Sequence, residues 1–262
     1  MNQVRPKKFL GQHFLTDLKI ASDIADTVDA CPEIPVLEVG PGMGVMTQFL
    51  LNKDREFKVV EIDRESVPYL QEHFPQLREG IIEADFLKMD LRKVFDGRPF
   101  VLTGNYPYNI SSQIFFKMLE HKDIIPCCTG MIQKEVAERM ASGPGSKVYG
   151  VLSVLIQAWY DVDYLFTVHE NVFNPPPKVK SAVVRLTRNS KKELGCNERL
   201  FRRIVKTVFT MRRKMMRNGM KQILPKDSPL LADPIFNMRP EQLSVEEFIA
   251  LTNRVEECLS NS

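Results

Sequence analysis

Short apolar runs alternate with longer amphipathic segments over the first 160 residues of the chain. The short runs are rich in Val, Ile and Leu, which is typical of buried parallel strands, and the longer segments carry apolar residues at helical spacing. The predicted strands are residues 35–40, 57–63, 80–85, 98–105 and 128–133. The predicted helices are residues 46–52, 65–73, 111–120 and 153–160. This alternation predicts an α/β fold built on a Rossmann-like sheet.

The pattern changes after residue 160. Residues 161–168 and 181–188 predict two further strands on either side of a loop with three consecutive prolines, and we expect them to close the sheet as an antiparallel hairpin. Residues 189–197 are polar and typical of a linker, and the chain beyond them is predicted to be helical. We therefore expect a Rossmann-like domain over residues 1–189 and a small α-helical C-terminal domain over residues 190–262.

Three glycines follow the first predicted strand at alternate positions, Gly40, Gly42 and Gly44. Glycine lets the backbone turn sharply and approach a bound ligand closely. The spacing is GxGxG, whereas the dinucleotide fingerprint is GxGxxG, in which the extra residue aims a helix N-terminus at a pyrophosphate. The turn therefore favours a cofactor that carries no phosphate.

An acidic residue ends the second predicted strand, as a ribose-binding carboxylate does in such folds. Glu61 lies 21 residues after Gly40, where its carboxylate can accept hydrogen bonds from both ribose hydroxyls, and Ile62 follows it directly. Asp63 shares the face of Glu61 and is the competing candidate. The second strand thus predicts one side of a nucleoside site.

Asp85 and Phe86 end the third predicted strand. The carboxylate can accept from an adenine amino group while the ring packs against the base. A glycine-rich turn alone is often no more than a tight connection between a strand and a helix. Its combination with Glu61 and this Asp-Phe pair indicates an adenosine-type cofactor and resembles the S-adenosylmethionine-dependent methyltransferases.

The tetrapeptide Asn105, Tyr106, Pro107 and Tyr108 follows the fourth predicted strand. The N6 lone pair of adenine is delocalised into the ring, so the nitrogen is a poor nucleophile until it is drawn out of conjugation. The Asn105 amide oxygen and the Tyr106 carbonyl are each predicted to accept one N6 hydrogen, which favours a pyramidal nitrogen without a strong base. Pro107 holds the residue before it extended, and Tyr108 offers a ring for stacking.

The alternative for this tetrapeptide is an ordinary strand end with a proline turn. Its position one strand after Asp85 favours the catalytic interpretation, in which an adenine is the acceptor.

Composition adds little to this prediction. The formal charge of +3 and the pI near 8.5 are only mildly basic, so the totals do not indicate a nucleic-acid partner. The five cysteines are scattered and lack metal-ligand spacing, so we expect free thiols in a reducing compartment, with no disulfide and no metal. The sequence shows no signal peptide and no membrane-spanning run, which predicts a cytoplasmic soluble protein, expected to be a monomer.

A basic segment over residues 199–224 contains nine Lys or Arg and no Asp or Glu. Its helical spacing places Leu200, Ile204, Val208 and Met211 on an inward face. The predicted RNA-binding residues on the opposite side and beyond are Arg202, Lys206, Arg212, Arg213, Lys214 and Arg217. A solvated face or a membrane-surface helix is the alternative, but the absence of acids and the adenine site favour RNA.

Five blocks together resemble the KsgA/Dim1 family of small-subunit (16S) ribosomal RNA adenine N6-dimethyltransferases. They are residues 7–15, the glycine-rich turn at 40–44, and residues 105–111, 173–181 and 212–214. The resemblance implies transfer of methyl groups from S-adenosyl-L-methionine to N6 of two adjacent adenosines near the 3′ end of 16S rRNA. It implies that the substrate is the small (30S) ribosomal subunit or its precursor, during ribosome biogenesis.

The resemblance also assigns roles to residues outside the predicted nucleoside site. It implies that Gln12, His13 and Leu15 lie over the methionine part of the cofactor, and that Phe173 is a second aromatic face opposite Tyr108. His13 stands where the family pattern has Asn, so its contact is expected from the backbone.

Tyr106 departs from the family pattern too, since it replaces Leu, Ile or Pro, which a carbonyl role tolerates. Three alternatives remain open: a large-subunit rRNA adenine methyltransferase of the macrolide-resistance type, a non-catalytic ribosome assembly factor, and a nicotinamide dehydrogenase.

Overall fold

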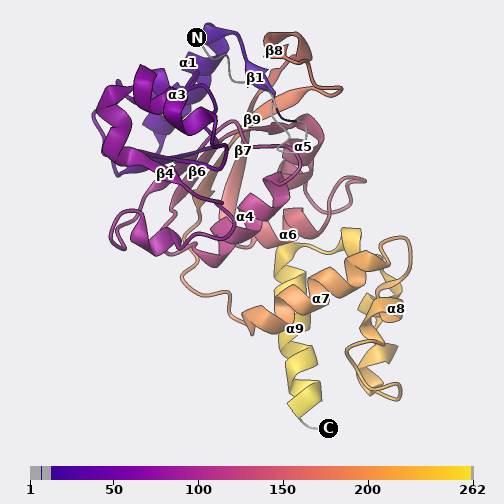
Figure 1. The fold of residues 1–262 in the computed structure, drawn as a ribbon. Coiled ribbons are helices and arrows are strands. Elements are labelled where there is room, and N and C mark those ends of the chain that lie inside the picture. Colours follow the sequence, from indigo (N-terminus) through magenta and orange to yellow (C-terminus); the bar gives the residue numbers. More distant parts are fainter. Residues whose placement is uncertain (1–6, 8–12, 261–262) are drawn as a thin grey trace. The chain divides into compact units, whose positions relative to one another are not determined.

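The computed structural model describes residue 7 and residues 13–260, and it divides the chain into two compact units (Figure 1). The first unit consists of Met1–Ala137 and Asp161–Arg188, and the second of Glu138–Tyr160 and Asn189–Ser262. The chain passes between the units at residue 188, one residue from the predicted domain boundary. The inclusion of Glu138–Tyr160 in the second unit is a feature that the sequence pattern does not predict.

Hydrogen bonds within the second unit explain why Glu138–Tyr160 belongs to it. The Gly145 N–H donates to the Glu241 carbonyl at 2.6 Å, and the Arg212 guanidinium donates to the Ser146 carbonyl at 3.2 Å. Both partners lie far along the chain in the C-terminal segment. These backbone groups therefore find their partners across a long sequence separation.

The first unit contains a mostly parallel seven-stranded sheet with the order β4-β3-β2-β5-β6-β9-β7. Its strands are β2 (Val36–Val39), β3 (Phe57–Glu61), β4 (Ile81–Glu83), β5 (Val101–Thr103), β6 (Cys127–Gln133), β7 (Tyr160–Val168) and β9 (Ser181–Arg188). Val36 of β2 aligns with Phe57 of β3 and Val101 of β5, both in parallel register, and β9 runs antiparallel to β6. The predicted α/β fold with two late strands is confirmed.

The strand order reverses beside β2, because the chain builds β3 and β4 on one side of it and β5 and β6 on the other. Open parallel sheets bind ligands at such a reversal, beyond the carboxyl ends of the strands.

The helices are α1 (Leu18–Asp26), α2 (Thr47–Leu50), α3 (Ser66–His73), α4 (Ser111–Glu120), α5 (Lys134–Ala141), α6 (Val151–Gln157), α7 (Glu198–Thr210), α8 (Met216–Met220) and α9 (Val245–Ser260). No element was predicted for α1. The Asp17 carboxylate caps it by accepting from the Lys19 and Ile20 N–H groups, and its Ile24 packs into the core of the sheet. Among the described residues, no helix is long and apolar enough to cross a bilayer.

A short two-stranded sheet joins the beginning of the chain to the proline-rich loop. Strand β1 (Phe14–Leu15) pairs antiparallel with β8 (Phe173–Asn174), so that Leu15 aligns with Phe173. Both of these side chains are buried in the core cluster that α1 covers. The pairing therefore brings His13, which precedes β1, close to the proline-rich loop, which follows β8.

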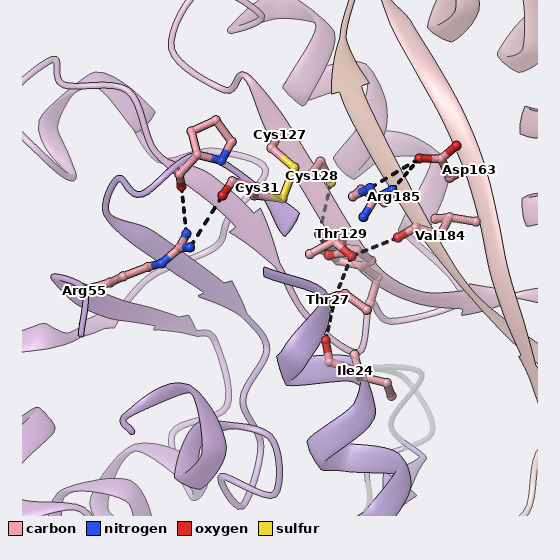
Figure 2. Close-up of a disulfide and its surroundings, with 12 residues drawn as sticks. Ile24, Thr27, Cys31, Arg55, Cys127, Cys128, Thr129, Asp163, Val184 and Arg185 are labelled. Atoms are coloured by element: carbon pink, nitrogen blue, oxygen red, sulfur yellow. Dashed lines mark hydrogen bonds and ion pairs between the residues drawn. A yellow bond between two sulfur atoms is a disulfide. The ribbon is translucent and has the colours of Figure 1, made fainter. Parts of the chain in front are cut away.

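A disulfide joins Cys31 to Cys127, which corrects the prediction that the cysteines are all free thiols (Figure 2). The two residues are 96 positions apart in sequence, and their Cα atoms lie 5.8 Å apart. Cys31 follows α1 and the short turn after it, and Cys127 begins β6. Next to Cys127, Cys128 keeps its buried thiol and Thr129 donates to the Val184 carbonyl.

Breaking this disulfide is expected to lower the free energy of unfolding by about 2–4 kcal/mol, because a cross-link across so long a loop restricts the unfolded chain. Urea unfolding with and without a thiol reductant measures the difference. The variant C196A is the control and is expected to retain the full effect of reductant. Peptide mapping under non-reducing conditions that found free thiols at Cys31 and Cys127 would contradict the assignment.

Candidate functional site

A cavity of about 240 Å³ lies at the carboxyl ends of β2, β3, β4 and β5, entirely within the first unit. Most of the residues predicted for cofactor and adenine binding line it together. They are His13, Leu15, Gly40, Gly42, Glu61, Ile62, Asp85, Phe86, Asn105, Tyr106, Pro107 and Tyr108. Gln12, predicted with them, lies outside the described residues. The parallel register of the sheet thus gathers residues from four separate stretches of sequence.

The glycine-rich turn leaves β2 with three positive φ angles, +67° at Gly40, +56° at Gly42 and +76° at Gly44. Residues with a side chain rarely adopt this region of φ. At Gly44 an added Cβ would also lie 2.2 Å from the Phe74 ring. The sequence therefore needs glycine here for backbone conformation and for packing.

Glu61 is the last residue of β3, and its buried carboxylate is held by the backbone. Oε2 accepts from the Gly42 N–H at 3.0 Å, and Oε1 accepts from the N–H groups of Ile62 and Asp63 at 2.8 Å. Burial raises the pKa of Glu61, and these backbone hydrogen bonds oppose that rise. A carboxylate has about four acceptor sites, so these three hydrogen bonds leave one site, on Oε2, for a ligand hydroxyl.

Asp63, the competing candidate, has a different role in the structure. It is absent from the cavity lining, and its Oδ1 pairs with the Lys7 ammonium at 2.5 Å. The geometry therefore favours Glu61 over Asp63 as the carboxylate that faces a ligand.

Glu38 is a buried cavity residue that the sequence analysis overlooked. It lies within the otherwise apolar strand β2, and its Oε2 accepts a hydrogen bond from Thr47 Oγ1 at 2.7 Å. Burial raises the pKa of Glu38 to about 8, and the Glu61 charge adds to the rise while the Thr47 hydrogen bond opposes it. A carboxyl group inside an apolar strand was the signal in the sequence that could have identified it.

The tetrapeptide continues the pairing of β5 with β6. The Tyr106 N–H donates to the Met131 carbonyl at 3.0 Å, and the Met131 N–H donates to the Gly104 carbonyl at 2.9 Å. The Tyr106 ring is fully buried, and its hydroxyl donates to the Thr129 carbonyl at 2.9 Å. Because its side chain serves the core, the backbone is the part of Tyr106 that is available to the cavity.

Asn105 and Tyr108 are both anchored by the segment around His13. Asn105 Nδ2 donates to the His13 carbonyl at 3.3 Å. The imidazole of His13 stacks on the Tyr108 ring with centroids 5.4 Å apart, and its Nδ1 lies 2.8 Å from the Pro175 carbonyl. Ser181 holds the other end of Tyr108 through a hydroxyl–hydroxyl hydrogen bond. Ser181 is the last residue of the block 173–181 that resembles the family, but the sequence predicted no role for it.

Phe173 is not among the residues that line the cavity with Tyr108. Its side chain is buried in the core cluster. Pairing of Phe173 with Leu15 in the small sheet accounts for this position. Its role as a second aromatic face stays a prediction.

In the second unit, α7 separates a buried apolar face from a basic one. Phe201, Ile204 and Val208 are buried, whereas Met211, predicted to face inward, is 36% exposed. Arg202 and Lys206 lie on α7, and the remaining basic residues follow it.

Two of the six basic residues predicted to bind RNA also hold their own unit together. Arg212 donates to the Ser146 carbonyl, and Arg217 donates to Asn237 Oδ1 at 2.8 Å. Arg213 and Lys214 are exposed between them.

The sheet and the cavity define a Rossmann-like S-adenosylmethionine-dependent methyltransferase. A family model described as ribosomal RNA adenine dimethylase matches residues 3–257, and the chain belongs to this family. The resemblance inferred from the sequence blocks is confirmed.

Relatives named ribosomal RNA small subunit methyltransferase A are similar over nearly the whole chain. The protein from Bacteroides thetaiotaomicron is 74% identical over 262 residues, covering 100% of this chain and 98% of the relative. That from Porphyromonas gingivalis is 58% identical over 253 residues, covering 96% and 98%.

Two solved structures share the fold. A dimethyladenosine transferase from Plasmodium falciparum has a TM-score of 0.77 at 24% identity, covering 94% of this chain and 98% of that one. The 23S rRNA methyltransferase ErmE has a TM-score of 0.66 at 26% identity, covering 91% and 99%.

Glu38 makes stability depend on pH. Its pKa of about 8 in the folded protein exceeds its ordinary value of 4.5, so its contribution is fully present below pH 4.5 and is lost as the pH rises toward 8. Between pH 4.5 and pH 7 this loss is expected to be on the order of 3 kcal/mol. In E38Q, which retains an acceptor for Thr47, the loss should disappear, as measured by urea unfolding across this pH range. The exposed Glu33→Gln is the control, and an E38Q slope equal to that of the wild type would contradict the assignment.

Proposed function

We propose that the chain transfers methyl groups to N6 of two adjacent adenosines near the 3′ end of small-subunit (16S) rRNA, giving N6,N6-dimethyladenosine. The observation that carries the proposal is the tetrapeptide, which presents the Asn105 amide and the Tyr106 backbone at the same cavity as Glu61 and Asp85. When bound there, S-adenosyl-L-methionine supplies an electrophilic methyl group. The relatives' names support the small subunit as the source of the rRNA.

The donor set of the cavity fits an adenosine-type methyl donor. Glu61 offers the remaining acceptor site of Oε2 for a ribose hydroxyl, and Asp85 with Phe86 offers an acceptor and a ring for the adenine. The glycine-rich turn leaves room beside these groups, because Gly40 and Gly42 have no side chains. The methionine part lies toward His13 and Leu15 in this proposal.

Asn105 and Tyr106 act on the acceptor nitrogen. The Asn105 oxygen and the Tyr106 carbonyl accept one N6 hydrogen each, which stabilises the pyramidal nitrogen as its lone pair turns toward the methyl group. Tyr108, fixed by Ser181, supplies a stacking face for the adenine. Transfer would form the N–C bond as the sulfur–methyl bond breaks, with S-adenosylhomocysteine as the leaving group. The methylated nitrogen would then be cationic and acidic and would release its proton to water, so no strong base is required.

The second unit supplies the RNA contacts in this proposal, through Arg202, Lys206 and the basic residues of 212–217. We further propose that the protein acts in the cytoplasm, as a monomer, on the small (30S) subunit or its precursor. Cytoplasmic thiols are generally kept reduced. The buried positions of Cys31 and Cys127 limit access of reductant to their disulfide.

Supplying labelled S-adenosylmethionine to small subunits, large subunits and free rRNA from a strain that lacks this methylation tests the proposal. Label is expected on N6 of adjacent adenosines in small-subunit rRNA. Label on large subunits alone would transfer the assignment to the activity named for ErmE. Absence of label from every substrate would leave the binding-protein alternative.

Replacement of Asn105 by Ala removes one of the two acceptors for the N6 hydrogens. Methyl transfer is expected to fall by on the order of 10²-fold or more. Cofactor affinity, measured by calorimetry, is expected to stay within a few-fold of the wild-type value. Asn253→Ala, in the C-terminal helix, is the control, and an unchanged transfer rate in N105A would rule out the proposed role.

Neutralising Arg213 and Lys214 together removes two exposed charges from the basic segment. If each contacts one phosphate, rRNA affinity falls and the slope of log affinity against log salt decreases by about 2. Filter binding over a salt series measures both quantities. The double variant K19A/K93A removes two exposed lysines of the first unit as a control. Equal slopes for the wild type and R213A/K214A would count against RNA contact there.

A further inference from the structure

Lys117 is a nearly buried cation behind the cavity. It lies on α4, and only 9% of its surface is exposed. Lysine is seldom buried to this extent unless its ammonium has partners, because removing the charge from water is costly. Burial lowers its pKa, and the negative charges of Asp85, Glu120 and Asp90 oppose that effect.

The partners of this ammonium belong to the segment that follows β4. Nζ donates a hydrogen bond to the Met89 carbonyl and lies 5.6 Å from the centroid of the Phe86 ring. A cation over the face of an aromatic ring within about 6 Å is attracted to it. Phe86 also lines the cavity, so the same ring belongs to the ligand site and lies near the Lys117 ammonium.

The same segment forms a tight turn around Asp85. The Asp85 carboxylate accepts from the Leu87 N–H at 2.9 Å, and the Asp85 carbonyl accepts from the N–H groups of Lys88 and Met89 at 2.9 and 3.0 Å. Met89 is where this turn ends. A hydrogen bond from Lys117 to its carbonyl therefore fixes the end of the turn that carries both Asp85 and Phe86.

We propose that Lys117 is a positioning residue for the adenine end of the cofactor site, acting through the Phe86 ring and the turn at Asp85. This inference rests on the proposed function, which assigns Asp85 and Phe86 to adenine. Helix α4 begins at Ser111, three residues after Tyr108. One helix thus connects the subsite for the methyl donor with the tetrapeptide that holds the methyl acceptor.

The test compares K117M, which keeps an unbranched side chain one atom shorter and removes the charge, with K117R, which keeps a cation and donors. The matched control is K88M, because Lys88 also lies near Asp85, with Nζ 3.4 Å from Oδ2, but is 85% exposed. Calorimetry measures the affinity for S-adenosylhomocysteine, and hydrogen exchange of the Leu87, Lys88 and Met89 amides is followed without ligand. Thermal unfolding verifies that each variant is folded.

K117M is expected to bind S-adenosylhomocysteine roughly tenfold more weakly and to exchange these three amides faster. K117R should recover most of both losses, and K88M should stay within about twofold of the wild type. With rRNA as substrate, KM for S-adenosylmethionine should rise in K117M while kcat changes by less than about threefold.

A further comparison uses S-inosylhomocysteine, which lacks the adenine amino group. The wild type should prefer the adenosyl compound, and K117M should lose part of this preference because Asp85 is less well placed.

Unchanged affinity and unchanged amide exchange in folded K117M would overturn the role of Lys117. If K117M does not fold, K117R decides, since wild-type behaviour of K117R supports the role and a tenfold weaker affinity overturns it. Failure of the wild type to bind S-adenosylhomocysteine would instead overturn the proposed function.

Discussion

The parallel pairing of β2 with β3 on one side and β5 on the other is the constraint on which the site depends. Parallel strands end at the same edge, so this pairing places Glu61 and the tetrapeptide beside the glycine-rich turn. A slip of one residue in register would turn each side chain to the other face of the sheet. The positions of the cavity side chains are therefore determined by the backbone hydrogen bonds between these strands.

Two buried carboxyls, Glu38 and Glu61, line the cavity at this edge, and the charge of Glu61 raises the electrostatic cost of ionising Glu38. They differ in what compensates them. Glu61 accepts three backbone N–H groups, whereas Glu38 accepts one hydroxyl. The better compensated group suits a ligand that brings hydroxyl donors, and the other suits a protonated state near neutral pH.

The sequence was sufficient to predict the sheet and most of the cavity, because the glycine-rich turn, Glu61, Asp85 and the tetrapeptide each come at the end of an apolar strand. His13 and Leu15 follow no predicted strand and came from the family resemblance. Local order along the chain does not determine contacts between distant segments. The disulfide forms because the turn after α1 lies against the start of β6. The segment Glu138–Tyr160 belongs to the second unit because its hydrogen-bond partners come after residue 200. Lys117 lies in a segment that the sequence predicts only as a helix, and the fold alone shows its contacts with Phe86 and Met89.

The contact between Asn105 and His13 shows how a distant segment sets the direction of the Asn105 amide. With Nδ2 donating to the His13 carbonyl, the amide oxygen points the other way. An amide rotated by 180° would bring two oxygens together, so the carbonyl selects one orientation. Among the described residues, Asn105 Oδ1 accepts no hydrogen bond, which leaves it available for an N6 hydrogen. Because pairing of β1 with β8 fixes Phe14, next to His13, the N-terminal segment determines which atom of the Asn105 amide is left for a ligand in the cavity.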